Sequence, residues 1–389
     1  MKVETLASLI GIPFNDTYET FFETYDLSED VECYQLIFCV DRCHFCESNY
    51  DLGTGVGFDR LNQIDYKSKI VALNVIDSII DENENIDIEK LTKFCNDHKD
   101  HNFLISNPLL NLQKGLDIPN LYSFTIGCSN FSRTGEKFLP CEKKEISNRF
   151  LSFNDNTKVH RVMTVSYLLS KDYADNGDFT FNLESETLTK PQDYKNFTPV
   201  PPELVSDFAA GYKKFKAREF NLLDVAKYDR ENIMPIINYN ENLLPVYERY
   251  GVEIITGSMF FERTPILTEK EVQNIFAKNF PIYINGVGIV RELKNMFDLD
   301  LFDDIIDHSY DEIEDHFERI AAAIDRNEHL LNGTTDIQKL WFENQHRFED
   351  NYRKMNAFIF DLDYQREWNH QRIKEGLEHF GVSVTKKVT

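Results

Sequence analysis

The segment from Thr268 to Lys294 constrains the fold more than any other part of the chain, because it predicts a helix, a strand, a turn and a second helix in succession. Thr268, followed three residues later by Glu271, forms a capping box, so a helix begins at Thr268. Phe280–Ile284 is a short apolar run that suits a buried strand. Asn285–Gly288 then turns the chain, since glycine tolerates positive φ. The segment therefore predicts an alternating α/β fold.

The start of this first helix also favours an anion. A helix start offers free amides and the positive end of the helix dipole, and here Lys270 lies in the first turn. A diphosphate would suit such a place. Most capped helices bind no ligand, so the segment by itself leaves a purely structural role open.

Length and charge set wider limits. A chain of 389 residues exceeds the ~250–300 residues at which single cores stop growing, so we expect two domains. The net charge of −24 disfavours broad affinity for nucleic acid, which needs clustered Lys and Arg, but it leaves room for one local basic groove.

Targeting signals are missing from the sequence as given. The N-terminal residues have too short an apolar run for a signal peptide, and no stretch approaches the ~18 apolar residues of a membrane span. Seven cysteines, an odd number, favour reduced thiols. We expect a soluble protein of the cytoplasm, or of the host cytoplasm if the chain is viral.

Residues 1–146 predict a Rossmann-like domain, because apolar strands alternate with helical periods. The expected strands are Tyr34–Val40, Lys69–Asp77, Asn102–Ser106 and Leu121–Gly127, with a helix over Ile86–Lys99. Asp41 and Asp77 each follow a strand, where open α/β sheets place ligands. If the domain binds an acceptor, either carboxylate is a candidate base.

Two patterns in this domain resemble ligand motifs only in part. Cys33, Cys39, Cys43 and Cys46 lack a matching second pair, so buried thiols are favoured over a structural zinc site. The glycines of Asp51–Arg60 lack the GxGxxG spacing of a phosphate loop.

Residues 147–335 predict the second domain. A strand over Arg149–Asp155 leads through a short turn into a helix over Lys158–Asp172, which opens with His160 and Arg161. This repeats the arrangement at Thr268, with a basic group in the first turn of a helix that follows a strand. Two such starts in one domain predict a shared anion site.

Two further features of this domain have structural alternatives. Tyr212–Arg218 carries Lys213, Lys214 and Lys216, a basic cluster that is either a solvated helix face or an acceptor-side contact with a polyanion. Glu253 lies within the apolar strand Gly251–Ser258, where a buried carboxylate needs hydrogen-bond partners.

The C-terminal part predicts helices. Asp303–Glu318 is acidic but keeps a helical apolar stripe, which predicts an amphipathic helix with a solvated acidic face. Residues 336–389 predict a long C-terminal helix that packs back across the domains.

Three segments resemble the glycosyltransferase-like proteins of phages and large viruses: RFLSFNDNTKVHRVMTVSYL, EIITGSMFFERTPILTEKEVQNIFAKNFPIYINGVGIVREL and FDDIIDHSYDEIEDHFERI. These proteins are similar in their C-terminal halves to the donor domain of the α-1,3-fucosyltransferase family. The resemblance covers about residues 148–325. The residues that match the family's motifs are Asn154, Arg161, Glu253, Thr268, Glu269, Lys270 and Pro281.

The resemblance implies a GT-B glycosyltransferase, with two Rossmann-like domains facing a cleft and the donor in the C-terminal half. It implies that Arg161 and Lys270 hold the donor diphosphate, with Asn154 and Thr268 beside it, and that Glu253 and Glu269 accept from ribose or sugar hydroxyls. The helix start at His160 adds this histidine to the donor-binding candidates. Fixed cations would then replace a metal ion. The co-substrate would be a UDP-, GDP- or dTDP-sugar, with no permanently bound cofactor.

The acceptor stays open between a hydroxymethylated base in viral DNA and a glycan. The sequence leaves the sugar, the stereochemical outcome and the oligomeric state undetermined. A second hypothesis is a non-catalytic adaptor that keeps the fold and binds a sugar phosphate or a polyanion. A third, an epimerase or hydrolase on similar domains, is disfavoured because no GxGxxG follows a strand.

Overall fold

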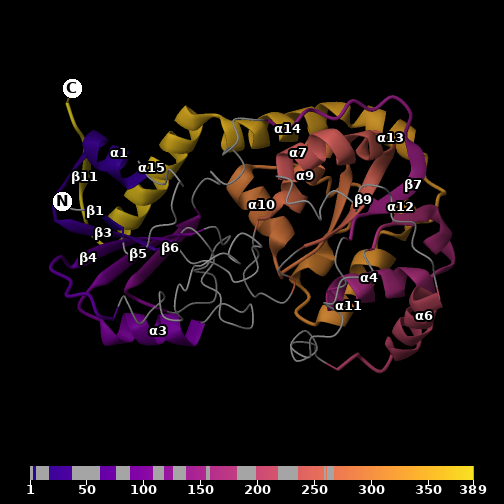
Figure 1. Cartoon of the computed structure of the whole chain (residues 1–389), viewed down its shortest axis with the longest axis horizontal. Coiled ribbons are helices and arrows are strands. Elements are labelled where there is room, and N and C mark those ends of the chain that lie inside the picture. Colours follow the sequence, from indigo (N-terminus) through magenta and orange to yellow (C-terminus); the bar gives the residue numbers. More distant parts are fainter. Residues whose placement is uncertain are drawn as a thin grey trace, which may run out of the picture. The chain divides into compact units, whose positions relative to one another are not determined.

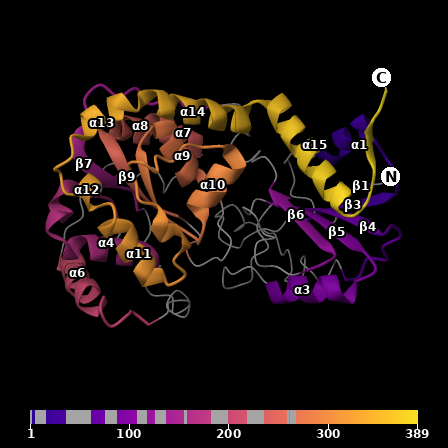
Figure 2. The ribbon, with the colours of Figure 1, turned by 180° about the vertical axis from the view of Figure 1, so that it is seen from behind.

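The structure is a computed structural model, which describes residues 3–5, 17–36, 62–75, 88–107, 118–125, 137–154, 158–181, 199–217, 235–257, 260 and 267–388. The chain folds into two compact units (Figures 1 and 2). The first unit comprises Met1–Cys128 together with Asp361–Thr389, and the second unit comprises Ser129–Phe360. The C-terminal residues therefore belong to the same unit as the N-terminal ones.

The first unit is built on a five-stranded parallel sheet in the order β1-β3-β4-β5-β6. The strands are β1 (Val3–Thr5), β3 (Val31–Leu36), β4 (Ile70–Val75), β5 (Asn102–Asn107) and β6 (Leu121–Thr125). The parallel α/β character predicted for this region is confirmed. The described strands follow one another across the sheet in chain order. They show no reversal of the kind that forms a ligand crevice in doubly wound sheets.

Helices α1 (Thr17–Thr24), α3 (Ile88–Asp97) and α15 (Leu362–His379) belong to the same unit. Phe21, Ile373 and Leu377 share one core with strand residues Ile70 and Leu104. Strand β11 (Val384–Lys386) pairs antiparallel with β2 (Tyr25–Leu27). The end of the chain is thus part of the core and of a sheet in the first unit.

The second unit is built on a four-stranded parallel sheet in the order β10-β9-β7-β8. The strands are β7 (Ser147–Ser152), β8 (Gly177–Phe179), β9 (Tyr250–Thr256) and β10 (Phe280–Ile284). After β7 the chain adds β8 on one side and then β9 on the other. The strand order therefore reverses between β7 and β9, as it does in doubly wound folds.

The helices of the second unit cover this sheet. The longer ones are α4 (Val159–Ser170), α6 (Val205–Ala217), α9 (Glu269–Ala277), α10 (Ile289–Phe297), α11 (His316–Asp325), α13 (Ile337–Glu343) and α14 (Gln345–Phe360). The short ones are η3 (Asp172–Asn176), α7 (Pro235–Asn238), η7 (Tyr239–Leu243), α8 (Leu244–Tyr247), η8 (Ser309–Glu312) and α12 (Glu328–Leu331).

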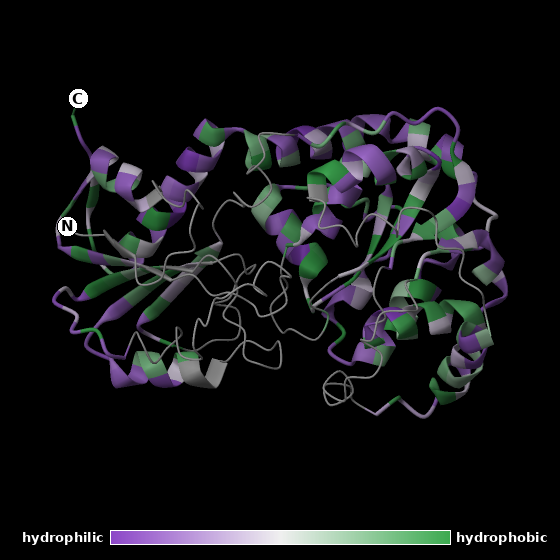
Figure 3. Cartoon of the chain, in the orientation of Figure 1, coloured by the Kyte–Doolittle hydropathy of each residue, from purple (hydrophilic) through white to green (hydrophobic). Residues whose placement is uncertain are grey.

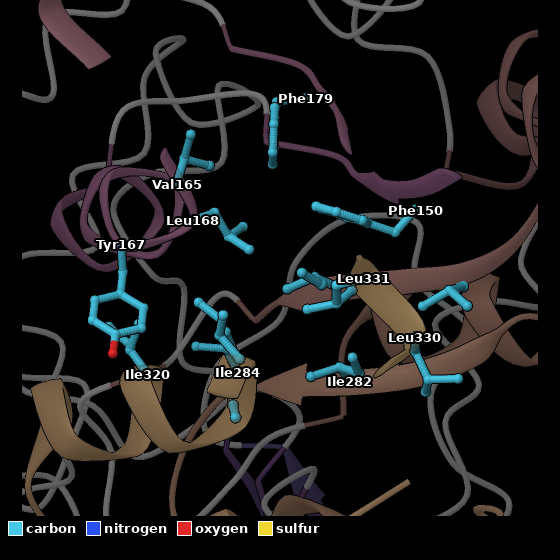
Figure 4. Packing of buried hydrophobic residues seen from close by; sticks show 14 of the residues in the cluster. Phe150, Val165, Tyr167, Leu168, Phe179, Ile282, Ile284, Ile320, Leu330 and Leu331 are labelled. Atoms are coloured by element: carbon cyan, nitrogen blue, oxygen red, sulfur yellow. The ribbon is translucent and has the colours of Figure 1, made fainter. Parts of the chain in front are cut away.

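One core joins the sheet to its helices. Val165 and Leu168 of α4 and Ile320 of α11 pack with Ile282 and Ile284 of β10 (Figure 4). The helices carry hydrophobic and hydrophilic residues in alternation (Figure 3), as helices with one buried face do. Helices α4 and α11 therefore cover the same face of the sheet.

The segment that begins at Thr268 folds as its sequence predicts. Thr268 caps α9, and β10 spans Phe280–Ile284. Gly288 precedes α10 with a φ of 84°, a conformation that favours glycine. Local sequence alone therefore sets these element boundaries.

The C-terminal region is not one long helix, as the sequence predicts, but the three helices α13, α14 and α15. Asp361 leaves the helical conformation, with φ −90° and ψ 103°. Its side chain accepts hydrogen bonds from the amides of Asp363 and Tyr364 and so caps α15. This cap separates α14 in the second unit from α15 in the first.

The acidic segment Asp303–Glu318 is also less helical than predicted. Helix α11 begins only at His316, because Asp315 caps it by accepting from the amides of Phe317 and Glu318. The preceding residues include only the short turn η8.

Candidate functional site

The carboxyl ends of β7 and β9 meet where the strand order of the second unit reverses. Asn154 follows β7, and Thr256 ends β9. The Thr256 hydroxyl donates to Asn154 Oδ1 at 2.7 Å, and the Asn154 amide donates to Ser152 Oγ at 3.0 Å. Both Asn154 and Thr256 are buried. Ligands of doubly wound sheets bind outside the strand ends at such a reversal, so this edge is the candidate ligand site.

Gly257 allows a close approach at this edge. It directly follows β9, and its amide donates to the Ile284 carbonyl at 2.9 Å. A Cβ at Gly257 would lie 2.2 Å from Cγ of Asn285, so only glycine fits. Asn285 in turn donates to Glu271 Oε1 at 2.7 Å. The ends of β9 and β10 are thereby tied to the first turn of α9.

The first turn of α4 gathers positive charge at the same edge. Lys158 is the N-cap, and no side chain among the described residues caps this helix start. The first turn contains His160 and Arg161 and no acidic residue. The Arg161 side chain is buried, with 2% of its surface exposed. The helix dipole and the neighbouring cations therefore make this start attractive to an anion.

His160 is fixed between the two strand ends. It is 1% exposed, its Nε2–H donates to the Gly257 carbonyl at 2.7 Å, and its ring stacks on Phe260 with centroids 5.1 Å apart. Burial lowers the pKa of His160 well below its ordinary value, and the charges of Arg161, Lys158 and Lys270 lower it further. His160 is therefore a neutral, oriented imidazole at pH 7.

The first turn of α9 is occupied by its own side chains. The Lys270 amide donates to the Thr268 hydroxyl at 3.4 Å, and the Thr268 amide donates to Glu271 Oε2 at 2.9 Å. The predicted capping box is confirmed. The sequence predicts free amide donors at this helix start, and this prediction was wrong.

Lys270 and Glu269 form an ion pair at the same start, with Nζ to Oε1 at 2.5 Å. Their side chains are 24% and 35% exposed. Burial raises the pKa of the Glu269 carboxyl, but Lys270 and, more weakly, Arg161 outweigh burial and hold this pKa below its ordinary value. Arg161 and Lys270 therefore act on the same two groups, His160 and Glu269.

Glu253 lies apart from these residues. Its side chain points to the face of the sheet opposite Val252, and it accepts from the hydroxyl of Tyr247 at 3.1 Å, from Asn274 at 2.7 Å and from Asn279 at 3.4 Å. These partners include the C-terminal half of α9 and the loop after it, at the other end from the first turn. Burial raises the pKa of Glu253 to about 7.

Lys143 completes this buried network. Its Nζ donates to Asn279 Oδ1 at 2.7 Å and to the Tyr247 carbonyl at 2.6 Å. Burial lowers the pKa of Lys143 to about 8. The network fixes α9 to the sheet with hydrogen bonds, so we do not include Glu253 in the candidate site.

No described contact connects the other predicted site residues to the carboxyl edge of β7 and β9. Asp41 and Asp77 lie outside the described residues. Lys213, Lys214 and Lys216 are exposed on α6, whose buried face packs on α4. Their solvated position fits the structural alternative and leaves contact with a polyanion as a prediction.

In the described parts of the chain, no group of three or more His, Cys, Asp or Glu side chains is arranged to hold a metal ion. Cys33, Cys95 and Cys141 are buried free thiols, whereas Cys39, Cys43 and Cys46 lie outside the described residues. Within these same ranges, no helix is both long and apolar enough to span a bilayer.

A cavity of about 640 Å³ lies beside α10. Its cations are already paired, Lys294 with Asp303 and Arg291 with Glu312. The remaining charged side chains of the lining are the carboxylates of Asp304, Asp307 and Asp311, besides His308 and His329. An excess of carboxylates is unsuited to a diphosphate, so this cavity does not compete with the edge near α4.

The sequence did not reveal the roles of Gly257, Phe260 and Asn285. The glycine after a predicted strand and the Asn-Gly pair after the next one were signals of tight turns at the carboxyl edge. Phe260 has no such signal, because its contacts come from α4 and α11.

Comparison with solved structures gives a weak structural likeness. No protein-family model and no curated protein matches this chain. The DNA modifying enzyme beta-glucosyltransferase, solved in the presence and absence of uridine diphosphoglucose, is a similar solved structure. The likeness covers 90% of this chain and 82% of that chain, with 11% sequence identity and a TM-score of 0.38. At this level it defines neither a family nor a site.

Proposed function

We propose that the chain is a glycosyltransferase that moves a sugar from a UDP-, GDP- or dTDP-sugar to a hydroxyl acceptor. The donor would bind in the second unit, outside the carboxyl ends of β7 and β9. One observation carries this proposal: Arg161 and Lys270, from two different helix starts beside the strand-order reversal, act on the same His160 and Glu269. If the two cations converge at this edge, as we propose, they would suit a diphosphate.

The chemistry follows from the charge of the leaving group. As the sugar leaves, negative charge develops on the nucleoside diphosphate. The guanidinium of Arg161, the ammonium of Lys270 and the dipole of α4 would stabilise this charge without a metal ion. The buried setting of Arg161 strengthens its interaction, because little water screens it.

Glu269 has a second role in this proposal. In the structure its carboxylate pairs with Lys270. When the donor binds, Lys270 would turn to the phosphates, and Glu269 would accept hydrogen bonds from ribose hydroxyls, as an ionised carboxylate can. His160 and Asn154 would shape the edge, since both are buried and held by strand-end groups.

The acceptor and the base are the least constrained parts. A hydroxymethylated base in DNA would need a basic surface, for which Lys213, Lys214 and Lys216 are candidates, and a glycan would not. Asp41 or Asp77 would deprotonate the acceptor if the reaction inverts configuration. The GT-B arrangement, with an acceptor domain facing the donor across a cleft, belongs to the same proposal.

The main alternative is an adaptor that binds a sugar phosphate or a polyanion without turnover. The two functions share the anion site, so binding alone does not separate them.

A thermal-shift series with UDP-, GDP- and dTDP-sugars tests the shared site first. We expect one nucleotide sugar to raise the melting temperature, because a ligand that binds only the folded chain stabilises it. No stabilisation by any of them would overturn the donor site. Release of free nucleoside diphosphate in the presence of acceptor DNA or glycan then separates an enzyme from an adaptor.

A further inference from the structure

Arg319 is a buried cation that the proposed chemistry does not use. It lies in α11, and 1% of its surface is exposed. Its guanidinium donates to the carbonyl oxygens of Ile313 at 2.6 Å, Glu314 at 3.3 Å and Phe260 at 3.3 Å.

Within the described part of the chain, the hydrogen bonds of Arg319 all go to backbone carbonyl oxygens and none goes to a carboxylate. Asp311 and Asp315 are the nearest acidic influences, and both already cap helix starts, of α10 and α11. Burial lowers the pKa of Arg319 to about 10, so the side chain remains charged at pH 7. A buried charge without a counter-ion is costly, and its position therefore calls for an explanation beyond a salt bridge.

Phe260 connects Arg319 to the candidate site. The Arg319 guanidinium lies over the Phe260 ring, 4.6 Å from its centroid, a cation–π contact. The same ring stacks on His160, with an interplanar angle of 13°. His160 precedes Arg161 in the first turn of α4 and is bonded to Gly257.

We propose that Arg319 is a positioning residue for the donor site, which holds the carbonyl and ring of Phe260 against His160 and so fixes the first turn of α4. The positioning itself does not depend on the proposed function. Only the identity of the ligand that the first turn of α4 binds rests on it. The planar fork of donors of Arg319 matters as much as its charge, because its guanidinium donates to three carbonyl oxygens and lies over the Phe260 ring.

Lysine at this position would keep the charge but lose the planar fork. Methionine would keep the side-chain length and the packing but lose both the charge and the planar fork. We therefore expect Arg319→Met to change pyrophosphate affinity and the His160 resonance more than Arg319→Lys does.

The experiment uses the full chain and two readouts. The first is the dissociation constant of inorganic pyrophosphate, measured by calorimetry for wild type, Arg319→Met and Arg319→Lys. The second is the imidazole N–H resonance of His160 in the histidine-labelled chain, assigned with His160→Gln. Arg326→Met is the matched control, because Arg326 is an exposed arginine at the other end of the same helix.

We expect Arg319→Met to weaken pyrophosphate binding by about tenfold, since small displacements of positioned groups cost this much or more. The His160 resonance should shift or broaden in the same variant. Arg319→Lys should lie between it and wild type, and Arg326→Met should match wild type in both readouts.

A folded Arg319→Met with an unchanged His160 resonance and unchanged pyrophosphate affinity overturns the inference. If wild type binds no pyrophosphate, the donor site is wrong, and the His160 resonance alone decides whether Arg319 positions that side chain. If Arg319→Met fails to fold, Arg319→Lys and Phe260→Leu take its place, with the same two readouts and the same criteria.

Discussion

The helix starts of α4 and α9 lie on the two sides of the strand-order reversal, but they are built in opposite ways. The start of α9 has a complete capping box, two glutamates in its first turn and a lysine already paired with one of them. The start of α4 has no side-chain cap among the described residues and no acid in its first turn, and it carries a buried arginine.

The difference shows which start supplies the positive field. The first turn of α9 carries two glutamates and one lysine, so its side chains leave no net positive charge. The pair of Lys270 and Glu269 is also partly exposed, so water screens it. The charge of Arg161 at α4 is buried, and the hydrogen bond of the neighbouring His160 to Gly257 holds this turn in place. Anion binding should therefore depend more on α4 than on α9.

The strongest test of this comparison replaces one cation at each start. We expect Arg161→Met to lower turnover by about 10³-fold and Lys270→Ala by about 10²-fold, within the range for removal of one charge-stabilising donor. The larger loss at Arg161 follows from its burial. Steady-state kinetics at saturating donor would measure both.

Arg353→Met is a suitable control for these variants, because its side chain is 73% exposed on α14. Equal losses for the two variants, or a larger loss for Lys270→Ala, would show that the contrast between the two starts does not govern function. If the variants bind the ligand more weakly and the wild type shows no turnover, the adaptor would be favoured.

A second prediction concerns the other end of α9, where Glu253 lies. Its pKa is about 7 in the folded chain, above the ordinary 4.5, because the side chain is buried. Between these values the folded chain holds a proton that the unfolded chain has released, so the free energy of unfolding falls as the pH rises through this range. Glu253→Gln should flatten this fall, by on the order of 2 kcal/mol between pH 5 and 7.

Urea unfolding at pH 5, 6 and 7 would measure the slope. Glu343→Gln, an exposed carboxylate on α13, should keep the slope of wild type. Lys143 has its lowered pKa at about 8, so its titration affects stability mainly above this window. A slope unchanged in Glu253→Gln would mean that the network at this end of α9 does not titrate.

The smallest effect is expected at Glu269, which neutralises Lys270 in the absence of a ligand. Glu269→Gln should strengthen pyrophosphate binding by about threefold, because a partly exposed ion pair contributes little. The same change should weaken the preference for a nucleotide over pyrophosphate if Glu269 accepts from ribose.

Calorimetry at low salt would detect both changes. Glu328→Gln is a matched control, since Glu328 is also the first residue of a helix. Pyrophosphate binding that is unchanged or weaker in Glu269→Gln would contradict the view that α9 is neutralised by its own side chains.

Local patterns predicted a large part of the fold. The capping box at Thr268, the strand Phe280–Ile284 and the glycine before α10 were all confirmed, because each depends on residues within one turn or strand. Most parallel strands of both units, although not β1 or β8, were also expected from apolar runs. The resemblance directed attention to Arg161 and Lys270 as one site, a pairing that remains a prediction.

Other features could not be read from local patterns. Glu253 was predicted to accept from a ligand, yet its oxygens accept from Tyr247, Asn274 and Asn279, which come from separate elements. The prediction of one long C-terminal helix was wrong, because the Asp361 cap interrupts the helix. Neither contact leaves a periodic signal in the sequence.

The sequence by itself determined where α9 and β10 begin, which residues are apolar, and that two helices with a basic residue in the first turn follow strands, because these depend on neighbours along the chain. Only the tertiary structure decided the strand order β8-β7-β9-β10 and the depth at which Arg161 is buried. It also decided which oxygens Glu253, His160 and Arg319 face. The physical reason is that burial and convergence depend on residues distant in sequence, whereas capping and periodicity do not.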